Sequence, residues 1–147
     1  MSDKWDIRFI ELAREYSKWS KDPSSQIGAV AVNPVHKNIL SHGYNGFPRG
    51  ILDLKERLED RPTKYMFVVH AEMNCIYNAT LTGTSLNESH LYVWGLPVCS
   101  ECAKGVIQVG IKKVFWSTDK QPSDKWLESY DQTCLMLNEA GVEMVRI

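Results

Sequence analysis

The sequence predicts an α/β protein, a three-layer α/β/α sandwich built on a mixed five-stranded sheet, and three observations predict it. Strand-like and helix-like segments alternate after residue 65, which is the pattern of parallel strands joined by right-handed crossovers. Before that point two apolar segments, 26–32 and 39–44, flank a turn and predict an antiparallel hairpin. The length of 147 residues, 44% of them apolar, suits a single domain that spans 1–147.

The first half of the chain is expected to supply one helix and the hairpin. Apolar residues recur at helical spacing over residues 6–19, and the cluster 21–25, which contains Pro23, ends that helix. The glycine-rich segment 43–50 follows the second strand, and its backbone freedom suits a loop that faces a ligand. Residues 51–64 alternate charges with leucines and are interpreted as a surface excursion with room for a helical turn.

The second half is expected to alternate helices and strands. The expected elements, in chain order, are a helix at 71–81, a strand at 90–94, a helix at 99–109, a strand at 112–116, a helix at 124–140 and a strand at 142–145. Gly83, Gly110 and Gly141 each follow a helical pattern and are typical helix stops. Three helices and three strands therefore follow the hairpin.

The charges of the chain argue against a long nucleic acid as partner. The 17 Lys and Arg residues nearly balance the 18 Asp and Glu residues, whereas binding along a phosphate backbone needs a strongly basic surface. A few basic side chains are enough to hold one phosphate, so a mononucleotide is compatible with this balance. The N-terminal segment lacks an apolar run, and no stretch reaches the ~20 apolar residues of a membrane span, so we expect a cytoplasmic protein without a membrane partner.

Two short segments carry the candidate site, H-A-E at 70–72 and P-V-C-S-E-C at 97–102. Zinc prefers nitrogen and thiolate ligands, and a catalytic zinc keeps three protein ligands so that water can take the fourth position. His70, Cys99 and Cys102 supply three such ligands. Because both segments are predicted at helix N-termini, helix dipoles and backbone N–H groups would favour charged thiolates there.

Glu72 follows His70 by two residues, so we expect it to face the bound water and the substrate rather than the metal. Zinc lowers the pKa of its water towards ~7, and a nearby carboxylate can then move protons. Glu72 is therefore the candidate catalytic residue. The combination of these two segments resembles the signature of the zinc nucleobase deaminases, in which hydroxide adds to the ring carbon that bears the amino group.

A structural zinc site or a redox pair is the alternative interpretation of C-x-x-C. A structural zinc needs a fourth protein ligand, and no other residue in the two segments is an obvious candidate. The remaining soft ligands are His36, His42, His90, Cys75 and Cys134. The two cysteines are predicted on apolar helix faces and the three histidines on turn or strand surfaces.

The likeness to one family extends beyond the metal residues. The segments 20–30, 43–50, 64–65, 70–74, 102–104 and 107–111 resemble those of the deoxycytidylate (dCMP) deaminases. This resemblance implies a cytidine deaminase-like fold and the zinc-dependent hydrolysis of dCMP to dUMP and ammonia, which would supply dUMP for thymidylate synthesis. The wider cytidine and tRNA adenosine deaminases share the zinc segments but usually not 43–50 in this form.

The resemblance also implies roles for four residues around the substrate. Asn45 would hydrogen-bond the sugar or base, the Ala71 N–H would bind the pyrimidine O2, a backbone carbonyl near Pro97 would accept from the amino group, and Trp116 would lie near the base. The alternatives are that Asn45 merely adopts a left-handed turn and that Trp116 is a core residue at the end of a strand.

Val98 departs from the family pattern, because it stands between Pro97 and Cys99 where proline commonly precedes the cysteine directly. Cys99 and Cys102 keep their spacing, so metal binding is expected to survive. The fit around the amino group of the substrate is the property that this residue puts in doubt.

A second, regulatory site is implied by the same resemblance. dCTP would activate and dTTP would inhibit, with Mg²⁺ on the triphosphate, and a homohexamer would place these sites near subunit contacts. The candidates are Lys21, Ser24, Asn45, Gly46 and Arg49. Basic side chains suit phosphates, and glycines let backbone N–H groups approach an anion. A solvated turn with surface charges is the alternative.

Two other functions stay open on the sequence alone. One is another deaminase of the superfamily, acting on a free nucleoside or on tRNA adenosine, and the near-neutral charge weighs against tRNA. The other is a nucleotide-sensing zinc module whose deaminase site has decayed. The presence of Glu72 weighs against that second alternative, because a decayed site has no need of the carboxylate.

Overall fold

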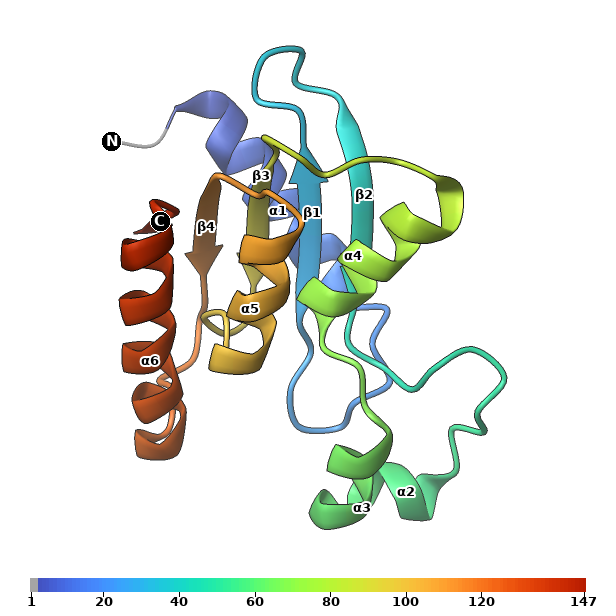
Figure 1. Cartoon of the computed structure of the whole chain (residues 1–147). Coiled ribbons are helices and arrows are strands. Elements are labelled where there is room, and N and C mark those ends of the chain that lie inside the picture. Colours follow the sequence, from blue (N-terminus) through green and yellow to red (C-terminus); the bar gives the residue numbers. More distant parts are fainter. Residues whose placement is uncertain (1–2) are drawn as a thin grey trace.

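Five strands form one mixed sheet in the order β2-β1-β3-β4-β5 in the computed structural model, which describes residues 3–147. Figure 1 shows the strands β1 to β4 of this sheet side by side. The strands are β1 (Gly28–Val32), β2 (Ile39–Tyr44), β3 (His90–Trp94), β4 (Lys113–Ser117) and β5 (Glu143–Arg146). β1 runs antiparallel to β2 and β3, whereas β3, β4 and β5 are parallel. The predicted hairpin and the predicted parallel strands are both confirmed.

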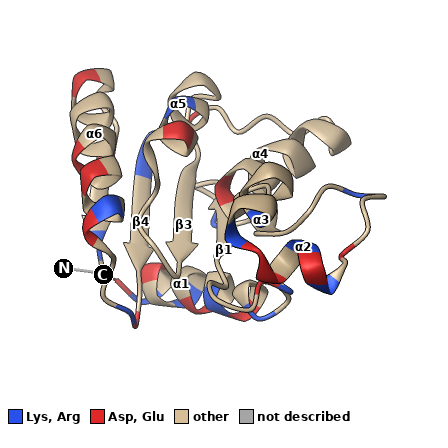
Figure 2. Ribbon diagram, turned by 90° about the horizontal axis from the view of Figure 1, so that it is seen from below, with Lys and Arg blue, Asp and Glu red and all other residues tan. Residues whose placement is uncertain are grey.

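Helices cover both faces of this sheet. One face carries α1 (Lys4–Ser17), and the other carries α4 (Ala71–Thr82), α5 (Ser100–Gln108) and α6 (Asp124–Ala140), as Figures 1 and 2 show. The predicted three-layer sandwich is therefore confirmed. None of the helices in the described part of the chain combines the length and the apolar character that a bilayer-crossing helix needs.

The core consists of two hydrophobic clusters, one on each face of the sheet. Val30 and Val32 of β1 point towards α1, whereas Ala29 and Ala31 point towards the layer of α4 to α6. All five residues of β1 are buried because alternate side chains face two covered sides. This double burial accounts for the unbroken apolar run at residues 27–32, which periodicity alone cannot assign to a face.

The first helix begins and ends two residues earlier than predicted. Asp3 accepts a hydrogen bond from the Asp6 N–H at 2.9 Å, and the Asp6 carboxylate accepts from the Asp3 N–H, so the two form a capping box that starts α1 at Lys4. Ser17 is the last helical residue, so residue 19 lies outside the helix. Boundary shifts of this size are ordinary at helix ends.

Residues 51–64 hold more structure than the expected surface excursion. Two short helices follow one another, α2 (Lys55–Glu59) and α3 (Arg61–Phe67). Lys64 in α3 is buried, with 4% of its surface exposed, so the prediction of a surface segment is wrong at that residue. The physical reason is an ion pair with Asp22, whose carboxylate lies 3.1 Å from the Lys64 ammonium.

Gly43 lets α4 lie directly on β2. A Cβ atom at this position would come within 2.7 Å of the Ala71 carbonyl oxygen, which is a backbone atom of α4. Contacts this short do not occur between real atoms, so only glycine fits here without moving the helix. The first glycine of the segment 43–50 thus serves helix packing, and through α4 it sets the position of the residue that precedes this helix, His70.

Candidate metal centre and active-site pocket

The two predicted metal segments come together at the N-termini of α4 and α5. His70 is the N-cap residue of α4 and Cys99 is the N-cap residue of α5, while Cys102 lies in the first turn of α5. α5 follows β3, so its N-terminus lies at the carboxyl edge of the parallel strands, where ligand sites of α/β sheets typically form. The predicted position of both segments at helix starts is confirmed.

The three candidate ligands fit a zinc ion. His70 Nδ1 lies 3.4 Å from Cys99 Sγ and 3.3 Å from Cys102 Sγ, and the three ligand atoms all lie within 4.8 Å of one another. Tetrahedral zinc with ordinary Zn–N and Zn–S bonds places such atoms roughly 3.5 Å apart. Within residues 3–147 these are the only His, Cys, Asp or Glu side chains that gather in this way. Three protein ligands leave a fourth position for water, as in catalytic sites.

The electrostatics of this cluster already favour a thiolate. The hydrogen bond with Cys102 lowers the pKa of Cys99, and the neighbouring His70 lowers it further despite the opposing effect of burial. The hydrogen bond between the two thiols raises the pKa of Cys102, and the separate hydrogen bond between Cys99 and His70 raises the pKa of His70. The two thiols therefore titrate as one coupled pair that carries a single negative charge before the second proton is lost.

The other soft ligands stay away from this centre. Cys75 is completely buried in the core and Cys134 is half-buried on α6, and neither belongs to the ligand cluster. His42 is half-buried rather than on the surface, because its ring stacks on Tyr16 with centroids 4.2 Å apart.

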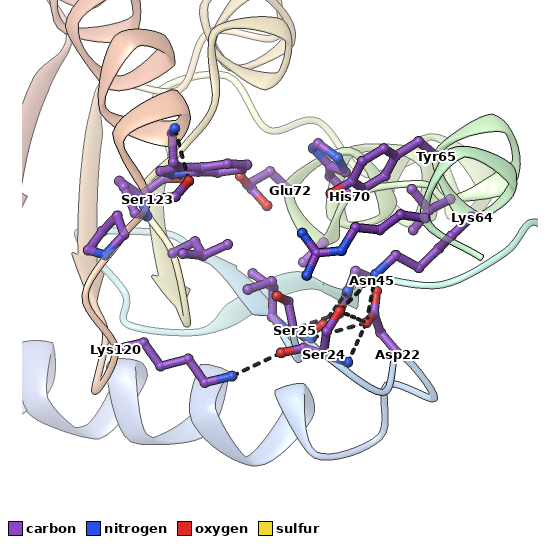
Figure 3. A pocket seen from close by; sticks show the side chains of 18 of the residues that line it. Asp22, Ser24, Ser25, Asn45, Lys64, Tyr65, His70, Glu72, Lys120 and Ser123 are labelled. Atoms are coloured by element: carbon purple, nitrogen blue, oxygen red, sulfur yellow. Dashed lines mark hydrogen bonds and ion pairs between the residues drawn. The ribbon is translucent and has the colours of Figure 1, made fainter. Parts of the chain in front are cut away.

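Glu72 is buried beside the metal ligands. Only 4% of its surface is exposed, and its side chain points into the pocket in Figure 3. Burial raises the pKa of Glu72 to about 7, although the nearby His70 acts in the opposite direction. A carboxyl group with this pKa can both accept and donate a proton near neutral pH.

A cavity of about 280 Å³ opens in front of these residues (Figure 3). Its inner wall contains His70, Ala71 and Glu72, and its other walls come from the loop 22–27, from Asn45, from α3 with the following Val68, and from the segments 96–97 and 120–126. The inner end of the cavity thus carries His70 and Glu72, and the other segments shape what can reach them.

The loop 22–27 is held in place by a buried carboxylate. Asp22 Oδ1 accepts hydrogen bonds from the backbone N–H groups of Ser24 and Ser25 at 2.9 and 3.0 Å and from Lys64 Nζ at 3.1 Å. Lys64 also donates to the Ser24 hydroxyl at 2.9 Å. Burial raises the pKa of Asp22, but the two N–H groups and the ammonium outweigh burial, and the pKa lies below its usual value.

Three of the four predicted substrate residues line the cavity, namely Asn45, Ala71 and Pro97. The Asn45 amide is already engaged: its oxygen accepts from the Ile27 N–H at 2.9 Å and its nitrogen donates to the Ser25 carbonyl at 2.8 Å. Asn45 does not adopt the left-handed backbone that was its alternative, because Lys37 and Glu88 are the only non-glycine residues with positive φ among residues 3–147.

Trp116 does not line the cavity, and this corrects the sequence-based expectation. It lies in β4 with 4% of its surface exposed and packs against Tyr130 in the core beneath α6, with ring centroids 5.7 Å apart. Its side chain faces the interior because alternate residues of β4 face opposite layers. The aromatic residues that line the cavity are Tyr65 and Trp126, and the ring centroid of Trp126 lies 6.5 Å from that of His70.

The five candidate regulatory residues are not gathered in one place. Lys21, Asn45 and Gly46 border a separate cavity of about 110 Å³, where Lys21 forms an ion pair with Asp53 at 2.8 Å. Ser24 lines the main cavity instead. Arg49 lines neither of these two cavities and donates a hydrogen bond to Asn78.

Sequence reasoning assigned no role to Arg61, Lys64, Lys120 or Trp126, although all four line the main cavity. Lys64 belongs to a segment that resembles the family, but the resemblance does not indicate what this residue does at the site. The other three lie in a charged surface-like segment or beyond the recognisable motifs, so no pattern in the sequence marks them.

With this geometry established, comparison with known proteins identifies the family. The family model described as the cytidine and deoxycytidylate deaminase zinc-binding region matches residues 3–118. The chain belongs to the cytidine and deoxycytidylate deaminase family. The His/Cys/Cys cluster is accordingly the zinc site of a deaminase domain. The segment from residue 119 onward lies outside the matched region, yet it contributes Lys120 and Trp126 to the cavity of this deaminase.

Several curated deaminases resemble the chain over nearly its whole length. The human deoxycytidylate deaminase is 40% identical over 95% of this chain and 77% of its own length. The "uncharacterized deaminase in luxG 3′ region" of Aliivibrio fischeri is 37% identical over 98% of this chain and 94% of its own length. A hydrolytic zinc deaminase is therefore the enzyme class of this chain.

Solved structures agree with the fold. The dCMP deaminase from the cyanophage S-TIM5, whose crystal structure is a complex with dCMP and dUMP, superposes with a TM-score of 0.78 at 25% identity, covering 100% of this chain and 99% of that one. The cytidine deaminase from Burkholderia pseudomallei, at 20% identity and a TM-score of 0.54 over 78% of this chain and 81% of that one, shares the fold.

Proposed function

We propose that the whole chain acts as one deaminase domain that hydrolyses dCMP to dUMP and ammonia. The observation that carries the proposal is a single cavity lined by Glu72 and by His70 of the His/Cys/Cys cluster, with the exposed basic side chains Arg61 and Lys120 also on its walls. The names of the relatives support the same substrate, since the human relative is a deoxycytidylate deaminase and the cyanophage relative is complexed with dCMP and dUMP.

The chemistry of the inner end follows from the residues present. Zinc held by His70, Cys99 and Cys102 would supply a water whose pKa is lowered to about 7. Glu72 would accept one proton of a water molecule while the water oxygen bonds to C4 of the cytosine ring, and would deliver that proton to N3. Glu72 would then carry the second proton to the amino nitrogen, so that the C4–N bond breaks, ammonia leaves, and a C4 carbonyl remains.

The walls of the cavity suit a substrate that carries a phosphate. Arg61 and Lys120 are exposed at the cavity, and neither takes part in any of the ion pairs found among residues 3–147. Lys120 donates to the Ser24 carbonyl at 3.0 Å, which holds its ammonium beside the loop 22–27 (Figure 3). Lys64 is neutralised by Asp22, so Arg61 and Lys120 are the cations available to an anionic group.

A substrate panel tests the function directly. The purified chain is assayed for ammonia release with dCMP, CMP, deoxycytidine, dCTP and a tRNA anticodon stem, and we expect the highest kcat/KM for dCMP. Arg61→Ala and Lys120→Ala should each raise the KM for dCMP about 10-fold, the cost of one charge-assisted hydrogen bond, and leave deoxycytidine turnover unchanged.

A basic residue away from the cavity provides the control for these two variants. Lys104→Ala, on the exposed side of α5 where Lys104 pairs with Glu101 at 2.9 Å, should leave the KM for dCMP at the wild-type value. Turnover of deoxycytidine or of the tRNA stem without turnover of dCMP would identify another deaminase of the superfamily. Nucleotide binding without ammonia release would identify a nucleotide-sensing zinc module.

We further propose regulation by nucleoside triphosphates. In this proposal dCTP activates and dTTP inhibits, with Mg²⁺ on the triphosphate, in a cytoplasmic homohexamer that supplies dUMP for thymidylate synthesis. The support is the family resemblance together with the cavity bordered by Lys21, Asn45 and Gly46, which shares Asn45 with the main cavity. The test measures deamination rates at a dCMP concentration below KM, with dTTP or dCTP added and with or without Mg²⁺. Rates that neither nucleotide changes would refute the proposed regulation.

A further inference from the structure

Helix α6 holds the backbone that carries the first zinc-binding cysteine. Trp126 Nε1 donates a hydrogen bond to the Pro97 carbonyl at 3.2 Å, and Thr133 Oγ1 donates to the Val98 carbonyl at 2.9 Å. Both bonds join side chains of α6 to main-chain oxygens of residues 97–98. The two carbonyls directly preceding the cysteine are thus held by a helix that lies outside the matched family region.

A third hydrogen bond continues this pattern on the far side of the cysteine. The backbone N–H of Ser100 donates to Ser129 Oγ at 2.8 Å. Positions 126, 129 and 133 follow the i, i+3, i+7 spacing of one helix face, so a single stripe of α6 holds both sides of Cys99.

The polar character of Thr133 distinguishes this contact from ordinary helix packing. Thr133 is completely buried, and Leu137, one turn later, is the other buried residue of α6. A buried hydroxyl destabilises the folded state unless it is hydrogen-bonded, so packing alone favours an apolar residue at position 133. The hydroxyl is explained by its bond to the Val98 carbonyl.

Val98 itself needs such a partner. It is completely buried and lies in the non-helical segment between β3 and α5, where no strand or helix ladder satisfies its carbonyl. A buried carbonyl without a hydrogen bond costs about 1–3 kcal/mol. The residue that separates proline from cysteine is therefore accommodated by a hydroxyl that α6 brings to it.

We propose that Trp126, Ser129 and Thr133 are positioning residues of the zinc centre. By holding residues 97–100 they set the distance between Cys99 Sγ and His70 Nδ1 and the orientation of the Pro97 carbonyl at the cavity. The part of this inference that concerns the Pro97 carbonyl rests on the proposed function, because it assumes that the substrate binds in this cavity. Its test measures metal binding without turnover, so failure of the inference and failure of the proposed function are distinguishable.

Thr133→Val removes the hydroxyl and keeps the branched shape. The dissociation constant for zinc, measured by competition with a chromophoric chelator on the full chain, should rise about 10-fold, as is typical when a group that orients a ligand is lost. The ligand-field absorption of the Co²⁺-loaded protein should shift as well. Thr133→Ser, which retains a hydroxyl, should restore both properties towards the wild-type values.

Ser129→Ala provides a second test at a half-buried position, where loss of folding is not expected. It should weaken zinc binding in the same direction as Thr133→Val, and it decides the question if Thr133→Val does not fold. The matched control is Tyr92→Phe, which removes a hydroxyl bonded to Asp6 at 2.6 Å on the opposite face of the sheet. This control should lower the thermal midpoint without changing zinc affinity.

If Thr133→Val and Ser129→Ala lower the thermal midpoint as Tyr92→Phe does, yet bind zinc with wild-type affinity and give the wild-type Co²⁺ spectrum, then α6 only packs against the core. The positioning role is supported if Ser129→Ala and Thr133→Val both bind zinc more weakly than the wild type, while Thr133→Ser binds zinc with nearly wild-type affinity.

Discussion

Two glutamates show how burial assigns a chemical role to a single residue. Glu72 and Glu101 each follow a metal ligand by two residues and lie in the first turn of a helix. Glu72 is 4% exposed, and burial raises its pKa to about 7, whereas the side chain of Glu101 is 81% exposed and pairs with Lys104. The same local context therefore yields a buried carboxyl group with a raised pKa only at the position that faces the cavity.

Replacing Glu72 by Gln removes the carboxyl group that we propose carries protons and keeps the size of the side chain. We expect kcat to fall by about 100- to 10,000-fold, the usual contribution of a general acid–base, while zinc content and far-UV circular dichroism stay at wild-type values. Glu101→Gln is the matched control and should keep the wild-type kcat. A Glu72→Gln enzyme within a few-fold of wild type would disprove the proton-carrying role.

At the scale of elements, a buried ion pair joins the loop after α1 to α3. Asp22 and Lys64 lie 42 residues apart in the sequence, and the side chain of each is 6% exposed. Breaking a buried pair by removing one partner leaves an uncompensated charge, which is strongly destabilising. The loop 22–27 and α3 consequently form one wall of the cavity and should move or unfold together.

Stability should decrease as the pH falls below about 4. The pKa of Asp22 is below its usual value in the folded chain, so the carboxylate stabilises the fold above its unfolded pKa of about 3.9, and this contribution is lost as the pH falls through the folded pKa. Urea unfolding at pH 7 and pH 3 measures the effect. Asp22→Asn should be less stable than wild type at pH 7 and should lose less on acidification; equal losses in both proteins would exclude this role of Asp22.

The contact between β2 and α4 gives a second prediction at this scale. A methyl group at Gly43 would meet the backbone of α4, so Gly43→Ala should lower the free energy of unfolding by about 1–3 kcal/mol, as overpacking does. Gly46→Ala is the matched control, because a Cβ at Gly46 has no heavy atom within 4 Å and should change stability by less than about 0.5 kcal/mol. Denaturant unfolding compares the two, and equal losses would contradict the packing argument.

At the scale of the whole molecule, the metal centre lies at one edge of a fold that has two hydrophobic clusters of its own. The cluster beneath α1 contains none of the metal ligands, and the larger cluster includes the two cysteines but extends across β1, β3 and β4. We therefore expect zinc to stabilise a fold that forms without it, in contrast to small domains that depend on the metal to fold.

Removing zinc with a chelator should lower the thermal midpoint and leave the far-UV circular dichroism unchanged at 25 °C. A ligand present at 100 times its dissociation constant stabilises the native state by about 2.7 kcal/mol, and that amount is lost on chelation. Calorimetry with and without the chelator measures it, and Cys99→Ser should show little response. Complete unfolding at 25 °C on chelation would mean that the metal is required for folding.

Except for the two short helices α2 and α3, the sequence alone determined the order of strands and helices, and it determined the direction of the strands, the three candidate zinc ligands and the glutamate beside them. These features are encoded locally: strand and helix periodicities repeat within a few residues, and each ligand pair or triplet falls at the start of one helix. The boundaries shifted by about two residues where a capping box formed, which is the ordinary limit of such patterns.

Tertiary structure alone decided which side chains surround the substrate. It buried Trp116 in the core and brought Trp126 to the cavity, buried Lys64 against Asp22, and gave the Val98 carbonyl a partner in Thr133, 35 residues away. These contacts join segments that are distant in the chain, so no local periodicity reports them. They depend on how helices lie on the sheet, and that arrangement exists only once the layers have packed.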